Sequence, residues 1–163
     1  MSKRKIGVLI FAGLLFLAAC NANRISQTET DIPDGVWNKD SLVKIPVTIT
    51  DIKQAYDIMV NIRASALYPS NNLWLFIVIE SPSGKLQKDT MECIFANERG
   101  KWLGDCMGDI CDFEIPFKGD VVFPETGIYN FYLQHGMRID NLPLVLSAGV
   151  SLYKHQPESN KDN

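Results

Sequence analysis

Most of this chain alternates between apolar and polar residues with a period of two, the pattern of strands that bury one face. The alternation is clearest over 43–50, 56–63 and 111–117, where the apolar positions are Val43, Ile45, Val47 and Ile49, then Tyr56, Ile58, Val60 and Ile62, then Cys111, Phe113, Ile115 and Phe117. Residues 73–79 are continuously apolar, which predicts a central strand buried on both faces. Pro46 and Pro116 predict edge strands or strand ends, because proline cannot donate a hydrogen bond to a neighbouring strand.

Turn sequences separate the predicted strands. Both Ser81-Pro82-Ser83-Gly84 and Pro124-Glu125-Thr126-Gly127 join residues that favour tight turns. Further strands are expected over 86–95, 121–123, 128–135 and 144–153, and only a short turn near 52–55 has helical character. About eight strands without a convincing helix indicate an all-β fold. We expect a single antiparallel β-sandwich domain over 32–154, jelly-roll or immunoglobulin-like, with the strand order left open.

The N-terminus has the three parts of a bacterial lipoprotein signal. Lys3, Arg4 and Lys5 form a positive n-region, and residues 6–19 are uncharged and too short to span a bilayer of roughly 30 Å. The run ends in Leu17-Ala18-Ala19-Cys20, which resembles a lipobox. We therefore expect a signal peptide over 1–19, cleavage by signal peptidase II between Ala19 and Cys20, and lipidation of Cys20 with diacylglycerol and an N-acyl chain such as palmitate. Two or more acyl chains anchor a protein stably without a membrane-spanning helix.

Both ends of the predicted domain are polar. Residues 20–31 have no periodicity and are expected to form the lipidated cysteine and a flexible tether. Residues 155–163 are polar, contain Pro157, and are expected to form a disordered tail.

The charge of the mature chain excludes some partners. Removing 19 of the 163 residues leaves 144, a usual size for one domain, with 13 basic against 19 acidic residues and a net charge of about −6. No basic cluster is present, so the sequence argues against nucleic acid and against a second, electrostatic membrane contact. The lipid is the expected membrane contact.

Three cysteines remain after Cys20, and their pairing is open. Disulfides are permitted in an exported chain, so Cys106 and Cys111 can pair with each other, or Cys93 can pair with either. Together with His135 these residues are also zinc ligand types, but their spacing is looser than a usual zinc knuckle and favours a disulfide or buried thiols. No metal and no other cofactor is therefore predicted.

Other chemically suggestive residues have a simpler interpretation. Asp105, Asp109, Asp112 and Glu114 do not match a calcium-binding loop and are expected to be a solvated stretch. The sequence contains no nucleophile elbow, phosphate loop or histidine metal motif, so no catalytic residues are predicted, although dispersed carboxylates leave a hydrolase as a third hypothesis. Gly136 is expected to supply a backbone conformation that ends a strand.

The aromatic residues offer one binding hypothesis. Trp37 and Trp102 flank turns and are candidates for stacking on sugar rings, whereas Trp74 lies in the most apolar segment and is expected in the core.

Several short motifs, in their order and spacing, resemble the gliding-motility lipoprotein family GldH of Bacteroidota over about residues 20–153. They are Trp37 with Lys39-Asp40-Ser41, Asn61-Ile62-Arg63 leading to Tyr68 and Asn72-Leu73, Pro82-x-Gly84 with Asp89-Thr90-x-Glu92, Trp102-Leu103-Gly104 with Gly108-Asp109, Val122-Phe123-Pro124-x-x-Gly127-x-Tyr129, His135-Gly136-Met137-Arg138, and Leu142-Pro143 before Gly149. The resemblance implies an envelope lipoprotein needed for surface gliding or the associated protein secretion, and the family has no catalytic residues to transfer.

These observations lead to one main functional hypothesis. We expect a non-catalytic accessory or structural subunit of the gliding or secretion machinery, with other envelope proteins as partners and strand addition as one mode of contact. Asn21-Ala22-Asn23-Arg24 contains no acidic run resembling the surface-export signal of these bacteria, so the expected location is the outer membrane, facing the periplasm. The alternative is an envelope glycan-binding β-sandwich module.

Overall fold

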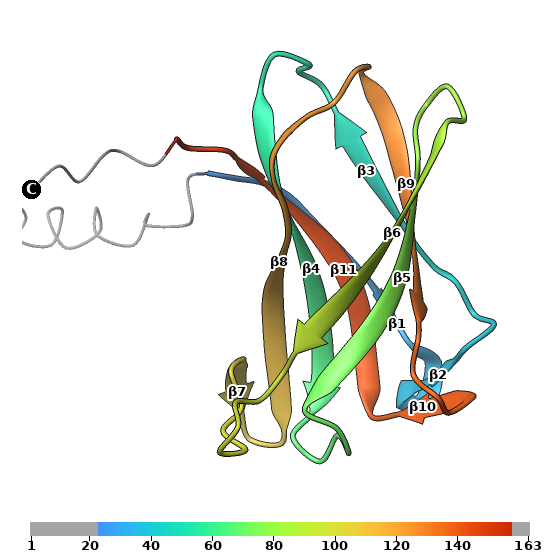
Figure 1. Cartoon of the computed structure of the whole chain (residues 1–163), viewed down its shortest axis with the longest axis vertical. Coiled ribbons are helices and arrows are strands. Elements are labelled where there is room, and N and C mark those ends of the chain that lie inside the picture. The colour runs from blue at the N-terminus through green and yellow to red at the C-terminus, as the bar shows by residue number, and fades with distance from the viewer. Residues whose placement is uncertain (1–22, 158–163) are drawn as a thin grey trace, which may run out of the picture.

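The computed structural model describes residues 23–157, and these residues form two packed antiparallel β-sheets (Figure 1). The signal peptide and Cys20 lie outside the described residues. The larger sheet has the order β1-β11-β4-β8-β7 and the smaller one β3-β9-β5-β6, while β10 and β2 form a separate pair. The strands are β1 (Arg24–Asp31), β2 (Val36–Asn38), β3 (Val43–Ile49), β4 (Ala55–Ser65), β5 (Asn72–Glu80), β6 (Leu86–Ile94), β7 (Asp105–Met107), β8 (Ile110–Val122), β9 (Gly127–His135), β10 (Asn141–Pro143) and β11 (Val145–Lys154). The predicted all-β sandwich is therefore confirmed.

The first strand corrects the prediction of a flexible tether over 20–31 for the residues that it contains, Arg24–Asp31. β1 pairs with β11 along its length, from Arg24 opposite Tyr153 to Asp31 opposite Ser147. Its side chains are mostly exposed, so the strand has no apolar alternation and could not be recognised by its pattern. A single 3-10 turn, Pro33–Gly35, connects β1 to β2.

The smaller sheet shows why proline marked an edge. Pro46 lies in β3, which is at the edge of this sheet and pairs only with β9. In the larger sheet Pro116 lies in the part of β8 beyond its short pairing with β7, so it too has a neighbour on one side only. Both proline predictions are confirmed.

The expectation that 73–79 is buried on both faces is wrong. In β5 the side chains of Leu73, Leu75 and Ile77 are buried between the sheets, whereas Trp74 and Phe76 on the other face are exposed. Among the described residues no third layer of strands or helices covers this face, so the strand is half-buried despite its continuous hydrophobicity. The prediction that Trp74 belongs to the core is wrong for the same reason.

The core fills the space between the two sheets. It contains the alternating side chains of β3, β4, β9 and β11, among them Ile45, Ile58, Phe131 and Leu152, all at most 1% exposed. Phe95 stacks on Phe113 with ring centroids 4.3 Å apart, which ties the two sheets together near β7. Among the described residues no helix is long and apolar enough to cross a membrane.

The described start of the predicted C-terminal tail is attached to the domain. His155 Nδ1 lies 2.7 Å from an Asp57 carboxylate oxygen, and its backbone N–H donates to the Ala55 carbonyl at 2.9 Å. The order therefore extends at least to His155, beyond the predicted limit at residue 154. The helical turn expected near 52–55 is a bend, and Ala55 already begins β4.

Candidate functional site

The structure resolves the open cysteine pairing. Cys106 and Cys111 lie opposite each other on β7 and β8 and form a disulfide, with Cα atoms 4.0 Å apart. Cys93 is a free thiol in the core, where burial raises its pKa to about 12. Within residues 23–157 no group of three or more metal-ligand side chains comes together, so Cys93 and His135 do not join the other cysteines in a zinc site.

His135 is a buried residue at the end of β9. Its side chain is 2% exposed and packs edge-on against Trp37, with ring centroids 5.7 Å apart. Neither ring nitrogen makes a hydrogen bond to a described residue. Burial lowers the pKa of His135, and this outweighs the opposing effect of the nearby backbone of Trp37 and Asp140. The ring is therefore a neutral part of the core.

Trp37 and Trp74 lie elsewhere than predicted. Trp37 is 1% exposed, and its indole Nε1–H donates to the Ser41 carbonyl at 3.0 Å, so it is unavailable for stacking on a sugar. Trp102 is half-buried against Phe113, with ring centroids 6.0 Å apart. Trp74 is the most exposed of the three and projects from the outer face of β5. The glycan hypothesis therefore loses one of its two ligand-facing residues.

The acidic stretch is solvated, as the sequence predicted. Asp112 forms an exposed ion pair with Arg63 at 2.7 Å, and Glu114 accepts a hydrogen bond from Tyr153 at 2.6 Å. Asp105 and Asp109 are exposed near the turn between β7 and β8. The carboxylates point to different neighbours, which is not how calcium is held.

The role predicted for Gly136 is wrong. This glycine is not among the residues with positive φ. A Cβ atom there would lie 3.1 Å from the Phe76 ring and 3.4 Å from the Trp74 Cβ. A side chain at this position would therefore press on the Phe76 ring, and the backbone there is not left-handed.

A first candidate surface lies at the end of the sandwich that holds the β7–β8 hairpin. We call it the distal tip, and define it by the exposed apolar side chains Leu67, Leu103, Met107 and Ile110. Leu67 and Met107 are 75% and 88% exposed. The disulfide fixes the hairpin, and the Ala66 N–H donates to the Asp109 carbonyl at 2.8 Å, which holds the β4–β5 loop against it. The tip is thus an ordered surface.

The distal tip is far from the start of the described chain. Asn23 is hydrogen-bonded to Lys154, opposite the first residues of β4, whereas Ile110 lies opposite Ser65 at the end of β4. The nine steps from Tyr56 to Ser65 extend about 30 Å at roughly 3.3 Å per residue. Figure 1 shows β7 at the lower end of the sandwich, away from the point where β1 begins.

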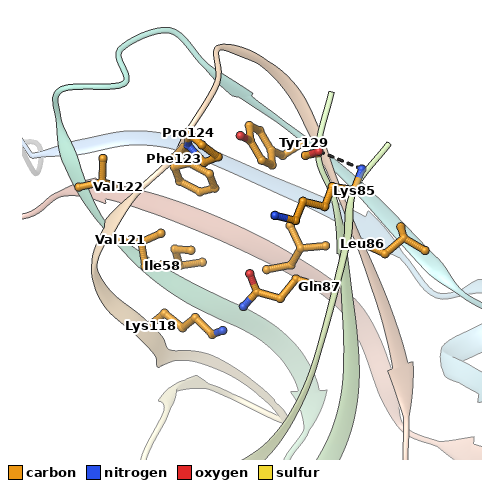
Figure 2. Close-up of a pocket in the computed structure, with 12 residues that line it drawn as sticks. Ile58, Lys85, Leu86, Gln87, Lys118, Val121, Val122, Phe123, Pro124 and Tyr129 are labelled. Atoms are coloured by element: carbon orange, nitrogen blue, oxygen red, sulfur yellow. Dashed lines mark hydrogen bonds between the residues drawn. The ribbon is translucent and has the colours of Figure 1, made fainter. Parts of the chain in front are cut away.

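A second candidate site is a pocket of about 310 Å³ between the two sheets, where β8 and β6 face each other (Figure 2). Its apolar wall includes Ile58, Ile79, Phe123 and Tyr129, all of them buried. The Phe123 and Tyr129 rings are 4.7 Å apart, and the Tyr129 hydroxyl donates to the Glu125 carbonyl at 3.2 Å, which fixes this wall. The volume is at the lower end of the range for small-molecule sites.

The polar groups of this pocket lie at its mouth. Lys85, Gln87 and Lys118 line the opening, and Figure 2 shows their polar ends on the same side of the apolar wall. Lys118 also pairs with Asp89, and this contact lowers the pKa of the Asp89 carboxyl. The arrangement suits a ligand with an apolar body and carbonyl or anionic groups at one end.

Sequence patterns did not identify either site. The residues of the distal tip lie in loops or beside turns, outside the alternating strands. Apolar residues in such segments were the only sign of this surface in the sequence. The pocket combines residues from β4, β5, β6, β8 and β9, so it exists only once the sheets have packed.

Comparison with known proteins places the chain in a family. The model of the family described as GldH lipoprotein matches residues 24–152, which is almost the whole described domain. This chain belongs to the GldH lipoprotein family. The resemblance inferred from its motifs is therefore confirmed.

Two relatives of GldH type match over most of their length. A gliding motility lipoprotein GldH homolog of Christiangramia forsetii is 34% identical over 131 residues, covering 80% of this chain and 79% of its own. The gliding motility lipoprotein GldH of Flavobacterium johnsoniae is 33% identical over 138 residues, covering 85% of this chain and 84% of its own. No solved structure matches this chain. The relatives support a lipoprotein involved in gliding motility.

Proposed function

We propose that this GldH-type chain is a non-catalytic accessory subunit of the gliding or associated secretion machinery, held at the outer membrane by lipid on Cys20 and facing the periplasm. The observation that carries this proposal is the distal tip, an ordered apolar surface about 30 Å from Asn23. A chain anchored just before Asn23 presents that end to the space beyond the membrane. An exposed apolar surface in this position suits contact with another protein.

The side chains of the distal tip indicate what kind of partner surface it would contact. Met107 and Leu67 provide the apolar centre of the contact, and the exposed carboxylates of Asp105 and Asp109 lie beside it. We therefore expect a protein of the envelope machinery whose own contact surface is apolar in the middle and basic at its rim.

The test is in-cell crosslinking with capture of the lipidated chain and mass spectrometry. Met107→Glu introduces a charge into the centre of the surface, whereas Ile128→Glu introduces the same charge at a 55% exposed position on β9, away from the tip. We expect motility or secretion components to be recovered with the parent chain and with Ile128→Glu, and reduced at least tenfold with Met107→Glu. Equal recovery with both variants would remove the distal tip from the proposal.

The anchor has a separate test. Cys20→Ala removes the thiol that would form the thioether, so the variant should move from the membrane fraction to the soluble fraction. Unchanged membrane fractionation of this variant, with full acylation, would refute lipid attachment at Cys20.

The second candidate function is a glycan-binding module, because Trp74 and Phe76 are exposed side by side on the outer face of β5. It predicts that Trp74→Ala abolishes retention on envelope polysaccharide, while Trp102→Ala, at the half-buried ring, has little effect. Absence of retention by the parent chain would end this alternative.

A further inference from the structure

The pocket between β6 and β8 lies at the same end of the domain as the expected lipid. Asn23 is bonded to Lys154, Lys154 lies opposite Tyr56, and Tyr56 lies opposite Val121, which lines the pocket. Three strand spacings of roughly 4.8 Å separate Asn23 from Val121, or about 15 Å. The pocket is therefore near the membrane-facing end of an anchored chain.

A lipid attached to Cys20 is close enough along the chain to reach the pocket. Three Cα–Cα steps lead from Cys20 to Asn23 and extend at most about 11 Å. One acyl chain spans about half of a hydrocarbon core of roughly 30 Å. The two lengths together exceed the separation between Asn23 and the pocket. A tether this short also gives its attached group an effective concentration on the order of millimolar at the pocket.

The chemistry of the pocket matches an acyl chain. Its volume of about 310 Å³ holds roughly ten groups of methylene size, since a water molecule occupies about 30 Å³ of liquid. The wall is aliphatic and aromatic, so it offers no buried charge that such a chain would have to cover. The amines of Lys85 and Lys118 and the amide of Gln87 are hydrogen-bond donors at the mouth, where the ester and amide carbonyls of a lipidated cysteine would lie.

We propose that this pocket holds part of one of the acyl chains attached to Cys20. This inference rests on the lipid attachment in the proposed function. It adds a second location for one acyl chain, inside the domain instead of in the membrane. An acyl chain in the pocket is withdrawn from the bilayer, so the domain weakens its own anchor while the pocket is filled. Membrane attachment and pocket occupancy are then linked by one equilibrium.

The test places a photoreactive benzophenone amino acid at Val122 in the full, lipidated chain in cells. Val122 is 58% exposed and lines the pocket, so the replacement does not disturb the core. The matched control carries the same group at Ile128, 55% exposed and absent from the pocket lining. After irradiation, mass spectrometry identifies the attached group. We expect an adduct with the lipidated N-terminal peptide from Val122, at least fivefold above that from Ile128.

A pocket-filling variant provides the second measurement. Val121→Phe should reduce the Val122 adduct at least fivefold, whereas Val78→Phe, at a similarly half-buried valine outside this pocket, should leave it unchanged. Suppose that Cys20 is lipidated but Val122 gives no adduct, or adducts with phospholipid alone. This result would overturn the proposal that the pocket holds an acyl chain of Cys20, and it would not affect the proposed lipid anchor. Absence of lipid on Cys20 would overturn both.

Discussion

Reduction of the Cys106–Cys111 disulfide should lower the free energy of unfolding of the domain by about 2 kcal/mol. The bond closes a loop with a sequence separation of five residues. In the chain-entropy account, a loop of this length restricts the unfolded chain by roughly 7 cal/mol/K, or about 2 kcal/mol at 25 °C. For a domain of this size the corresponding fall in melting temperature is roughly 6–10 °C.

The assay is urea unfolding of the non-lipidated Cys20→Ala chain, followed by tryptophan fluorescence, with and without a reductant. In the folded chain Cys93 is fully buried and its pKa is raised to about 12, so it remains a thiol there with and without reductant. A Cys93→Ala variant should therefore show the same difference between oxidised and reduced protein. The slope of the free energy of unfolding against urea concentration should be the same in both conditions, since the same surface is exposed on unfolding.

Two outcomes would refute this reasoning. A loss of stability below about 0.5 kcal/mol would mean that the hairpin is already restricted in the unfolded chain, so loop closure is not the source of the stabilisation. A gain in stability on reduction would mean that the bond strains the native hairpin. The expected result also makes the distal tip sensitive to reductant, because the disulfide holds β7 beside β8 next to Met107.

Two further predictions concern buried positions. The pKa of His135 is lowered in the folded state, so the unfolded state binds the proton first and the free energy of unfolding should fall as the pH decreases below about 6.5, by at most about 1.36 kcal/mol per pH unit. Urea midpoints at about pH 7.5 and about pH 5 should show this loss, and His135→Phe should remove it. The same pH dependence of stability in the His135→Phe variant would contradict the role given to His135. Gly149→Ala should lower the free energy of unfolding, measured in urea, by about 1–3 kcal/mol, because the added Cβ would lie 2.4 Å from the Thr28 carbonyl oxygen and from the Glu29 Cγ. An unchanged free energy of unfolding would show that β1 is loosely paired with β11.

The sequence predicted the strands that bury one face. Period-two alternation in β3, β4 and β8 and the turn residues between strands depend on local contacts with water and core, so the pattern is visible in the residues themselves. β1 escaped because an edge strand with exposed side chains has no alternation, and only its pairing with β11 makes it a strand. For β5 the pattern indicated burial on both faces, because a run such as Trp74 to Phe76 does not reveal whether a second layer covers it.

The sequence by itself determined the all-β class and the family resemblance, and it predicted the lipoprotein signal, because each depends on residue types at fixed spacing along the chain. Only the tertiary structure decided that Cys106 pairs with Cys111, that Trp37 is buried, and that Trp74 is exposed. It also decided where the pocket and the distal tip lie. These features depend on which strands become neighbours across the two sheets, and that arrangement is set by the packing of side chains distant in sequence rather than by any local pattern.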